Sequence, residues 1–447
     1  MVDPISAGAA SSESRIEQAL ATLRALHPKK IDLGLERIEA VLAKLGHPEQ
    51  QMPPIIHVAG TNGKGSTLAN LRAIAEAAGL TAHVYTSPHL VHFRERIVVS
   101  GKEIGDDALV DVLTRVREAN AGAPLSFFEA TTAAAYLAFS ESAADVALIE
   151  VGLGGRYDAT NVIQPTCCAI TPIDYDHAEF LGRDLAGIAR EKAGIMKAHV
   201  PVICGLQGDL VNAVLDAEAQ KAKADIKVWG QDYRAFRQHG RLVFEQDEEM
   251  LDLPLPALRG EHQIRNAGLA VMVARTMGWP AEAIATGLQY AVWPARLQSL
   301  TKGIYAEMAH DAGAELWLDG GHNPHAARAV ANAMAELEQT TERPLILITG
   351  ILANKDIGGF LDAFEGLASA VIGISIPDHD SLAPETLREL AMGRNMMGYI
   401  ADGIPQAVQL AIKTGKDLSP ETTDHSIIAP RILICGSLYL AGEVLKG

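Results

Sequence analysis

The sequence predicts an α/β fold with two domains: an N-terminal P-loop-type ATPase domain on a mostly parallel sheet, and a C-terminal Rossmann-like α/β domain. The chain has 447 residues, more than one ordinary hydrophobic core holds. Apolar runs of strand length alternate with helical segments, as in parallel sheets covered by helices. The segment Trp293 to Leu297, which contains a proline, interrupts this alternation. We therefore expect domains at 1–297 and 298–447.

The composition narrows the class of protein. A hydrophobic content of 48% and 40 glycines fit a folded α/β protein. Lys and Arg number 38 against 55 Asp and Glu, a net charge of −17 that disfavours nucleic acid as a partner. The sequence shows neither a leader-like start nor an apolar run of membrane-spanning length, so we expect a soluble, cytoplasmic protein. The cysteines show no CxxC pattern and are expected to be reduced core thiols: Cys167, Cys168, Cys204 and Cys435.

The first predicted strand, residues 55–59, runs into a loop of small residues. In such a loop the backbone N–H groups and the next helix surround an anion, and a lysine adds a full charge. The pattern departs from the usual P-loop at Val58, where Gly is usual, and at Gly65, which separates the lysine from the serine. A glycine-rich turn without a ligand is the alternative. We predict a nucleotide phosphate site made of Gly60, Thr61, Asn62, Gly63, Lys64, Gly65 and Ser66.

Polar residues follow later strands of the same predicted sheet. Ser87 comes after residues 81–85, Glu150 ends residues 145–150, and His177 follows residues 166–171. The carboxyl ends of parallel strands meet at one edge, so these side chains are candidate ligands for Mg²⁺, although imidazole suits softer metals better. Taken singly, Ser87 is more often a turn residue and His177 a hydrogen-bonded histidine. Lys192, in a charged helix, would alone be a solvated side chain.

The second half repeats the α/β alternation. A strand at 315–319 is followed by a loop at 320–325, and Pro324 stands where a helix can begin. Further strands are expected at 345–350, 371–376 and 431–435, and short strands at 226–258 before an Ala-rich helix. No GxGxxG pattern occurs, so a dinucleotide site is not favoured.

Together and in this order, the motifs resemble folylpolyglutamate synthase/dihydrofolate synthase, a branch of the Mur ligase superfamily. The resemblance covers nearly the whole chain. It rests on GTNGKGS at 60–66, EVGLGGRYDATN at 150–161, REKAGI at 190–195, Ser87-Pro88-His89, Asp176-His177, His262–Asn266 and Asp319–His325.

The resemblance implies a role for each matching position. The phosphate loop would hold ATP, Asn266 would contact the adenine, Arg296 the terminal phosphate, and Asp319 and His322 the nucleotide. The implied metal ligands are Ser87, Glu150, His177 and Lys192, the last as a carbamate. The implied catalytic residues are Lys64, His177, Lys192 and Arg296, of which His177 and Lys192 would act through metal and not as proton carriers. The implied pterin pocket comprises Lys30, Ile31, Asp32, Leu33, Ser126, Phe127, Phe128, Glu129, Arg156, Tyr157, Asp158 and Ala159.

The implied activity is ATP-dependent ligation of L-glutamate to dihydropteroate and to tetrahydrofolate or its polyglutamates through an acyl phosphate, with release of ADP and phosphate. Two Mg²⁺ ions would be the cofactors and ATP a co-substrate. The expected partners are these small molecules only, without nucleic acid or membrane, and the protein is expected to be a monomer.

Other functions remain open. The enzyme could be a monofunctional folylpolyglutamate synthase. A Mur-type peptidoglycan ligase would need an additional UDP-binding domain, and only some fifty residues precede the phosphate loop. A nucleotide-binding regulator would not need Glu150, His177, Lys192 and Arg296 together.

Overall fold

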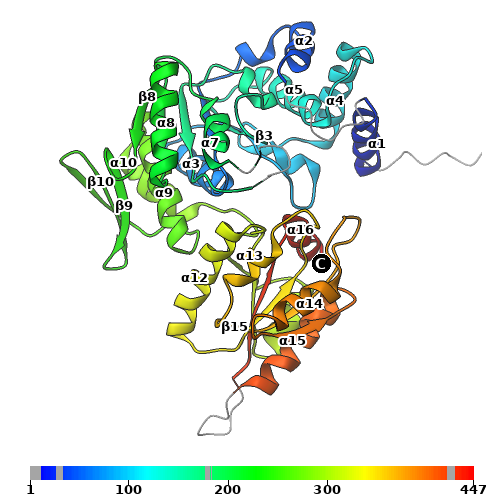
Figure 1. Cartoon of the computed structure of the whole chain (residues 1–447). Coiled ribbons are helices and arrows are strands. Elements are labelled where there is room, and N and C mark those ends of the chain that lie inside the picture. Colours follow the sequence, from blue (N-terminus) through cyan, green and yellow to red (C-terminus); the bar gives the residue numbers. More distant parts are fainter. Residues whose placement is uncertain (1–11, 27–33, 177–181, 183, 420–427) are drawn as a thin grey trace, which may run out of the picture. The chain divides into compact units, whose positions relative to one another are not determined.

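The computed structural model describes residues 12–26, 34–176, 182, 184–419 and 428–447. The chain divides into two compact units (Figure 1). The first unit takes residues 1–173, 177–233 and 269–287, and the second takes 174–176, 234–268 and 288–447. Each unit has its own main sheet, and the predicted domain junction after residue 297 stays a prediction.

The first unit is built on an eight-stranded sheet in the order β4-β3-β2-β5-β1-β6-β7-β8, counted over the described residues. The strands from β2 to β8 in this order are parallel, whereas β3 and β4 form an antiparallel edge. Strands β1, β5 and β6 are buried along their whole length, which explains why the sequence shows them as apolar runs. The strands are β1 Ile55–Ala59, β2 Ala82–Tyr85, β3 Ile97–Val99, β4 Lys102–Glu103, β5 Val146–Glu150, β6 Cys167–Ile170, β7 Pro201–Cys204 and β8 Asp225–Val228.

Helices of the first unit pack in two clusters of buried apolar side chains. One cluster joins α1, α2, α4 and α5 to alternate residues of β5, and the other joins α7 and α8 to β6 and β7. The helices are α1 Ser12–Arg24, α2 Glu36–Lys44, α3 Lys64–Ala77, α4 Asp106–Asn120, α5 Phe127–Ser140, α7 Leu185–Ala193 and α8 Asp209–Ala222. Short 3₁₀ turns are η1 Pro48–Gln50, η2 Phe93–Arg96 and η3 Ala159–Val162. Helix α9 Glu261–Thr276 begins in the second unit and ends in the first, and α10 Ala281–Tyr290 follows it.

The second unit contains a six-stranded sheet in the order β12-β13-β17-β14-β15-β16 among the described residues. All neighbours are parallel except β12 and β13. The strands are β12 Gln298–Ser299, β13 Glu315–Leu318, β14 Leu345–Thr349, β15 Ala368–Gly373, β16 Met397–Ile400 and β17 Arg431–Cys435. The helices are α11 Ile304–Asp311, α12 Pro324–Thr340, α13 Ile357–Asp362, α14 Pro384–Met392, α15 Ile404–Leu418 and α16 Leu438–Lys446. A separate antiparallel sheet is formed by β9 Tyr233–Gln238, β10 Arg241–Gln246 and β11 Glu249–Leu253.

The predicted fold class is confirmed, with small differences at element ends. Helix α3 begins at Lys64, two residues before the apolar periodicity does, because Gly63 with φ of +91° lets the chain turn into the helix directly. All four cysteines are buried free thiols, as expected. Within the described ranges, the helices are all too short or too polar to cross a membrane.

Candidate active site

The loop after β1 lies against the end of the neighbouring strand β6. Thr61 donates its N–H to the Pro172 carbonyl at 3.0 Å, and Thr171 donates its N–H to the Ala59 carbonyl at 2.8 Å. A Cβ atom on Gly60 would lie 1.9 Å from Thr171 Oγ1, and Gly60 has φ of +141°. Only glycine fits this position, so the first glycine of the predicted loop is required by close approach as well as by conformation.

Lys64, the first residue of α3, folds back over the loop. Its Nζ donates to the carbonyls of Gly60 at 3.2 Å and Thr61 at 3.3 Å, and it lies 4.0 Å from Glu150 Oε1. The start of a helix carries partial positive charge, to which the ammonium group adds. The loop therefore offers a positive, hydrogen-bond-donating surface at the carboxyl edge of the sheet.

Lys192 reaches the same loop from the other side. It is buried near the end of α7, and its Nζ donates to the Gly60 carbonyl at 2.9 Å. The glycine-rich run at 152–155 makes this approach possible, because a Cβ on Gly155 would lie 2.6 Å from the Glu191 carbonyl oxygen. Two lysines distant in sequence thus meet at one carbonyl of the phosphate loop.

Ser87 and Glu150 lie together at the ends of adjacent parallel strands. Ser87 follows β2, Glu150 ends β5, and the Ser87 N–H donates to Glu150 Oε2 at 3.1 Å. In the register of the sheet Glu150 pairs with Val58, two residues before Gly60. Glu150 is 5% exposed. Its carboxylate therefore lies beside Lys64 and the loop, as the sequence predicted.

The other predicted metal ligands are less completely placed. In the described part of the chain, no three His, Cys, Asp or Glu side chains group together as metal ligands. The predicted set contains only two such residues, Glu150 and His177, and His177 lies outside the described residues. The metal site therefore stays a prediction.

One segment of the predicted pterin pocket, Ser126–Glu129, packs against the glycine-rich run that precedes Arg156–Ala159. Ser126 caps α5, where its hydroxyl accepts from the Glu129 N–H and Glu129 accepts from the Ser126 N–H, a reciprocal capping box. The single N–H of Arg37 Nε is shared between the two oxygens of the Glu129 carboxylate, at 3.0 and 3.1 Å. A Cβ on Gly152 would lie 2.4 Å from the Phe128 ring, so the glycine-rich run packs directly against the start of α5.

Asp158 organises the run that follows Glu150. Its buried carboxylate accepts from the Leu153 N–H at 2.8 Å and the Thr160 N–H at 3.0 Å. Burial raises the pKa of the Asp158 carboxyl, and hydrogen bonds from Thr160, Leu153 and Gly152 oppose that rise. The adjacent Tyr157 is 48% exposed. Of these two predicted pocket residues, Asp158 shapes the loop and Tyr157 is accessible. Lys30, Ile31, Asp32 and Leu33 lie outside the described residues.

In the second unit, Asp319 holds the segment that carries Arg296. Asp319 Oδ2 accepts from the Leu297 N–H and Oδ1 from the Gly321 N–H, both at 2.7 Å. Ala295 and Leu297, on either side of Arg296, have positive φ of 55° and 43°. Burial raises the pKa of Asp319, which the charge of Arg296 opposes. Strained non-glycine residues persist where surrounding bonds hold them, and they concentrate at functional sites.

A cluster around Asp176 in the second unit includes residues that the sequence did not single out. Asp176 forms an ion pair with Lys355 Nζ at 2.6 Å and accepts from Asn323 Nδ2 at 3.2 Å. His322 Nε2 lies 3.4 Å from Asp176 Oδ2. Lys355 follows strand β14 in the run Asn354-Lys355-Asp356, and a lysine at a carboxyl strand end was the signal that could have identified it.

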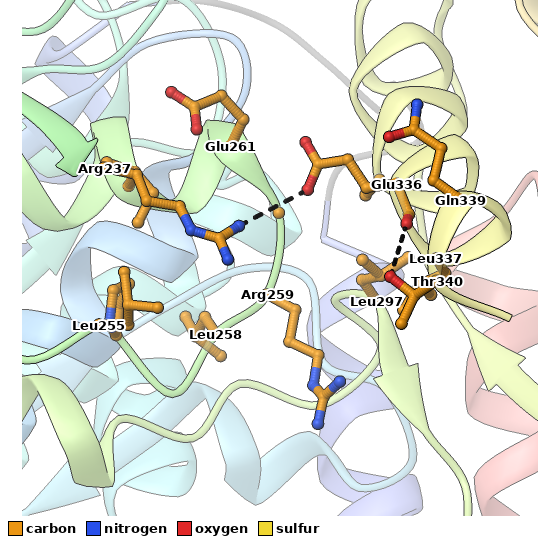
Figure 2. A pocket seen from close by; sticks show the side chains of 14 residues that line it. Arg237, Leu255, Leu258, Arg259, Glu261, Leu297, Glu336, Leu337, Gln339 and Thr340 are labelled. Carbon is orange, nitrogen blue, oxygen red and sulfur yellow. Dashed lines mark hydrogen bonds and ion pairs between the residues drawn. The ribbon is translucent and has the colours of Figure 1, made fainter. Parts of the chain in front are cut away.

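A pocket of about 500 Å³ also lies in the second unit, between the segment 255–264 and α12. In Figure 2, Arg237 from β9 and Glu336 from α12 point toward one another, with an ion-pair distance of 3.9 Å. Leu255, Leu258 and Leu337 form its apolar wall. None of the predicted nucleotide-binding residues lines this pocket.

Comparisons with known proteins agree with this arrangement. A family model described as the Mur ligase middle domain matches residues 58–274, and one described as the Mur ligase, glutamate ligase domain, matches residues 306–423. The fold is therefore that of a Mur-type ligase.

Individual relatives narrow the class. The folylpolyglutamate synthase of Lacticaseibacillus casei is 34% identical over 434 residues, which are 91% of this chain and 92% of that protein. The dihydrofolate synthase/folylpolyglutamate synthase of Escherichia coli is 31% identical over 431 residues, 96% of this chain and 94% of that protein. The chain belongs to the dihydrofolate synthase/folylpolyglutamate synthase family of ATP-dependent ligases.

Solved structures give the same result. Escherichia coli FolC in complex with DHPP and ADP has a TM-score of 0.86 and 30% identity and covers 98% of both chains. The bifunctional folylpolyglutamate synthase/dihydrofolate synthase from Yersinia pestis, complexed with AMPPNP and a Mn ion, has a TM-score of 0.84 and 29% identity and covers 98% of this chain and 99% of that one.

Proposed function

We propose that this enzyme is bifunctional: it joins L-glutamate to dihydropteroate and also extends tetrahydrofolate and its polyglutamates, using ATP. The observation that carries the proposal is the meeting of Lys64, Lys192, Ser87 and Glu150 around the Gly60 loop. This set can bind phosphates and a divalent cation, and it contains no Ser-His or Cys-His pair that would activate a protein nucleophile. It therefore suits transfer of a phosphoryl group from ATP to a substrate carboxylate.

The residues of the first unit would act mainly by position and charge. The acceptor carboxylate attacks the γ-phosphorus of ATP, the bond to the β-phosphate oxygen breaks, and an acyl phosphate and ADP form. Lys64 stabilises negative charge on the phosphoryl oxygens, and the N–H groups of the loop fix the phosphate chain. The amine of L-glutamate then attacks the acyl carbon, phosphate leaves, and the amine loses a proton. Water must be excluded, because acyl phosphates hydrolyse readily.

The oxygen atoms of Ser87 and Glu150 fit a Mg²⁺ site, since this cation prefers hard oxygen ligands and retains water. We propose that these residues, with His177 and carbamylated Lys192, hold two Mg²⁺ ions. When bound, the ions would neutralise charge on the phosphates. The burial of Glu150 supports a site in which electrostatic effects are strong.

The acceptor and the nucleotide would use the remaining predicted residues. We propose that the pterin lies against the segments Ser126–Glu129 and Arg156–Ala159, where Phe128 packs on Gly152. We also propose that Asn266 contacts the adenine and that Arg296 binds the terminal phosphate. Asp319 supports Arg296 through the backbone of Leu297, and His322 would contribute to the same nucleotide site. The protein is proposed to act as a cytoplasmic monomer.

A coupled assay tests the proposal. The purified protein is supplied with Mg-ATP and L-glutamate, and ADP release and product mass are compared with dihydropteroate, with tetrahydrofolate and without an acceptor. Turnover with both acceptors is expected. Turnover with tetrahydrofolate alone would assign a monofunctional folylpolyglutamate synthase. Absence of acceptor-dependent ADP release from protein that binds ATP would overturn both assignments.

A further inference from the structure

Three polar side chains at the start of α9 form a hydrogen-bonded chain. Asn266 Nδ2 donates to Gln263 Oε1 at 3.0 Å, and Gln263 Nε2 lies 3.2 Å from His262 Nε2. Gln263 is 1% exposed and Asn266 5% exposed. His262 Nδ1 is also buried and has no hydrogen-bond partner among the described residues. The hydrogen-bonded series therefore connects Asn266, the predicted adenine contact, to an imidazole for which the sequence predicts no role.

The donors and acceptors in this chain fix one another. Because Gln263 offers its oxygen to Asn266, its NH₂ group faces His262, and His262 Nε2 must be the ring nitrogen without a proton. Burial, together with the charges of Arg296, His325 and Arg265, lowers the pKa of His262 to about 4, so the ring is neutral near pH 7 and carries its single proton on Nδ1.

The same hydrogen bonds restrict the orientation of the Asn266 side-chain amide. If Asn266 rotated by 180°, its oxygen would face the Gln263 oxygen and the bond would be lost. Gln263 could rotate with it only if His262 offered a proton at Nε2. Neither amide can therefore turn alone, because the orientation of both amides is linked to the tautomer of His262.

The backbone makes room for the imidazole. A Cβ on Gly260 would lie 2.8 Å from His262 Nδ1 and 2.7 Å from its Cε1. Gly260 has φ of +103°, a conformation that L side chains rarely adopt. The ring therefore packs directly over a glycine that both permits the turn into α9 and leaves the space that the ring fills.

We propose that His262 is a positioning residue for the nucleotide base: through Gln263 it fixes the Asn266 amide in the orientation that accepts adenine and rejects guanine. A correctly oriented asparagine pairs with the N6 amino donor and a ring-nitrogen acceptor of adenine, whereas guanine presents an acceptor oxygen in place of the amino group. This inference rests on the proposed contact between Asn266 and adenine.

The test measures binding of ADP and of GDP to the full chain by calorimetry. His262→Phe removes the acceptor and is expected to weaken ADP binding about 3- to 10-fold, the loss for one hydrogen bond, with little change for GDP. Gln263→Leu interrupts the hydrogen-bonded series but leaves the imidazole in place. It should reduce the preference for ADP over GDP by a similar factor. His262→Gln, which restores an acceptor oxygen, should recover most of the preference. Added to Asn266→Ala, His262→Phe should have no further effect.

His83→Phe is the matched control for loss of a buried imidazole. The His83 ring stacks on Phe139 at 4.7 Å in the first unit, so this variant should lose stability but keep the preference for ADP over GDP. An unchanged preference in Gln263→Leu or soluble His262→Phe, with the preference lost in Asn266→Ala, would overturn the role of His262. An unchanged preference in Asn266→Ala would instead refute the proposed adenine contact.

Discussion

The substitution Glu150→Gln removes the negative charge of the side chain at the end of β5 but keeps its shape. The amide retains an oxygen that can accept from the Ser87 N–H, a bond of 3.1 Å in the wild type. The negative charge beside Lys64 Nζ, 4.0 Å away, is lost. We therefore expect the variant to fold but to bind the divalent cation poorly.

The size of the effect follows from the burial of this group. Glu150 is 5% exposed, so solvent cannot replace the lost charge. An interaction with a charged partner is worth about 1.5–3 kcal/mol, which corresponds to a roughly 10- to 150-fold higher Mg²⁺ requirement.

The assay is ADP release at saturating ATP and acceptor as a function of free Mg²⁺, supported by direct Mn²⁺ binding measured by electron paramagnetic resonance. Asp145→Asn is the matched control. Asp145 precedes β5 at its opposite end, where its carboxylate accepts from Thr81, and this variant should leave the Mg²⁺ requirement unchanged. An unchanged requirement in Glu150→Gln would show that the carboxylate only holds the Ser87 backbone.

Two further predictions concern the backbone of the loop and the stability of the second unit. Gly60→Ala places a Cβ 1.9 Å from Thr171 Oγ1, so the loop must shift, and thermal shift assays should find a folded protein that ATP stabilises much less. Arg431→Met removes partly buried bonds from the buried Arg431 to Glu315 at 2.8 Å and Glu338 at 3.0 Å, and urea unfolding at pH 7 should give a loss of about 2–4 kcal/mol. Burial, the largest single effect, raises the pKa of Glu315, but the hydrogen bonds from Arg431 and Trp317 and the charges of Arg431 and Arg343 together outweigh it, so the net pKa is lowered. The wild-type advantage should therefore be full above pH 4.5 and shrink as pH falls below that ordinary value; an advantage that grows in acid would contradict this reasoning.

The parts of the site that the sequence predicted are those that depend on local order along the chain. A strand, a glycine-rich loop and a helix follow one another directly at 55–77, and their geometry is nearly independent of the remaining fold. Ser87 and Glu150 were predicted beside the loop because parallel strands bring their carboxyl ends to one edge. Neither prediction requires knowledge of side-chain packing.

The parts that escaped prediction depend on contacts between distant segments. The sequence identifies Lys192 only through resemblance, and it does not show that its amine bonds to the Gly60 carbonyl, 132 residues away. The contact of Asp319 with nucleotide stays a prediction, and the sequence did not show that both of its oxygens accept backbone N–H groups that hold the residues around Arg296. A carboxylate in a motif can thus act through the backbone it supports.

Asp158, Asp319 and His262 share a feature that bears on how this family of sites is built. Each is a polar group whose pKa is shifted toward the neutral form by burial, and each is held by bonds to backbone or amide groups. A buried polar group that is held in this way cannot reorient without losing bonds that water does not replace. The predicted functional residues next to them, such as the exposed Tyr157 and the half-buried Arg296, therefore start from a fixed backbone. Precision in this site comes from buried polar residues that do not themselves need to touch the substrate.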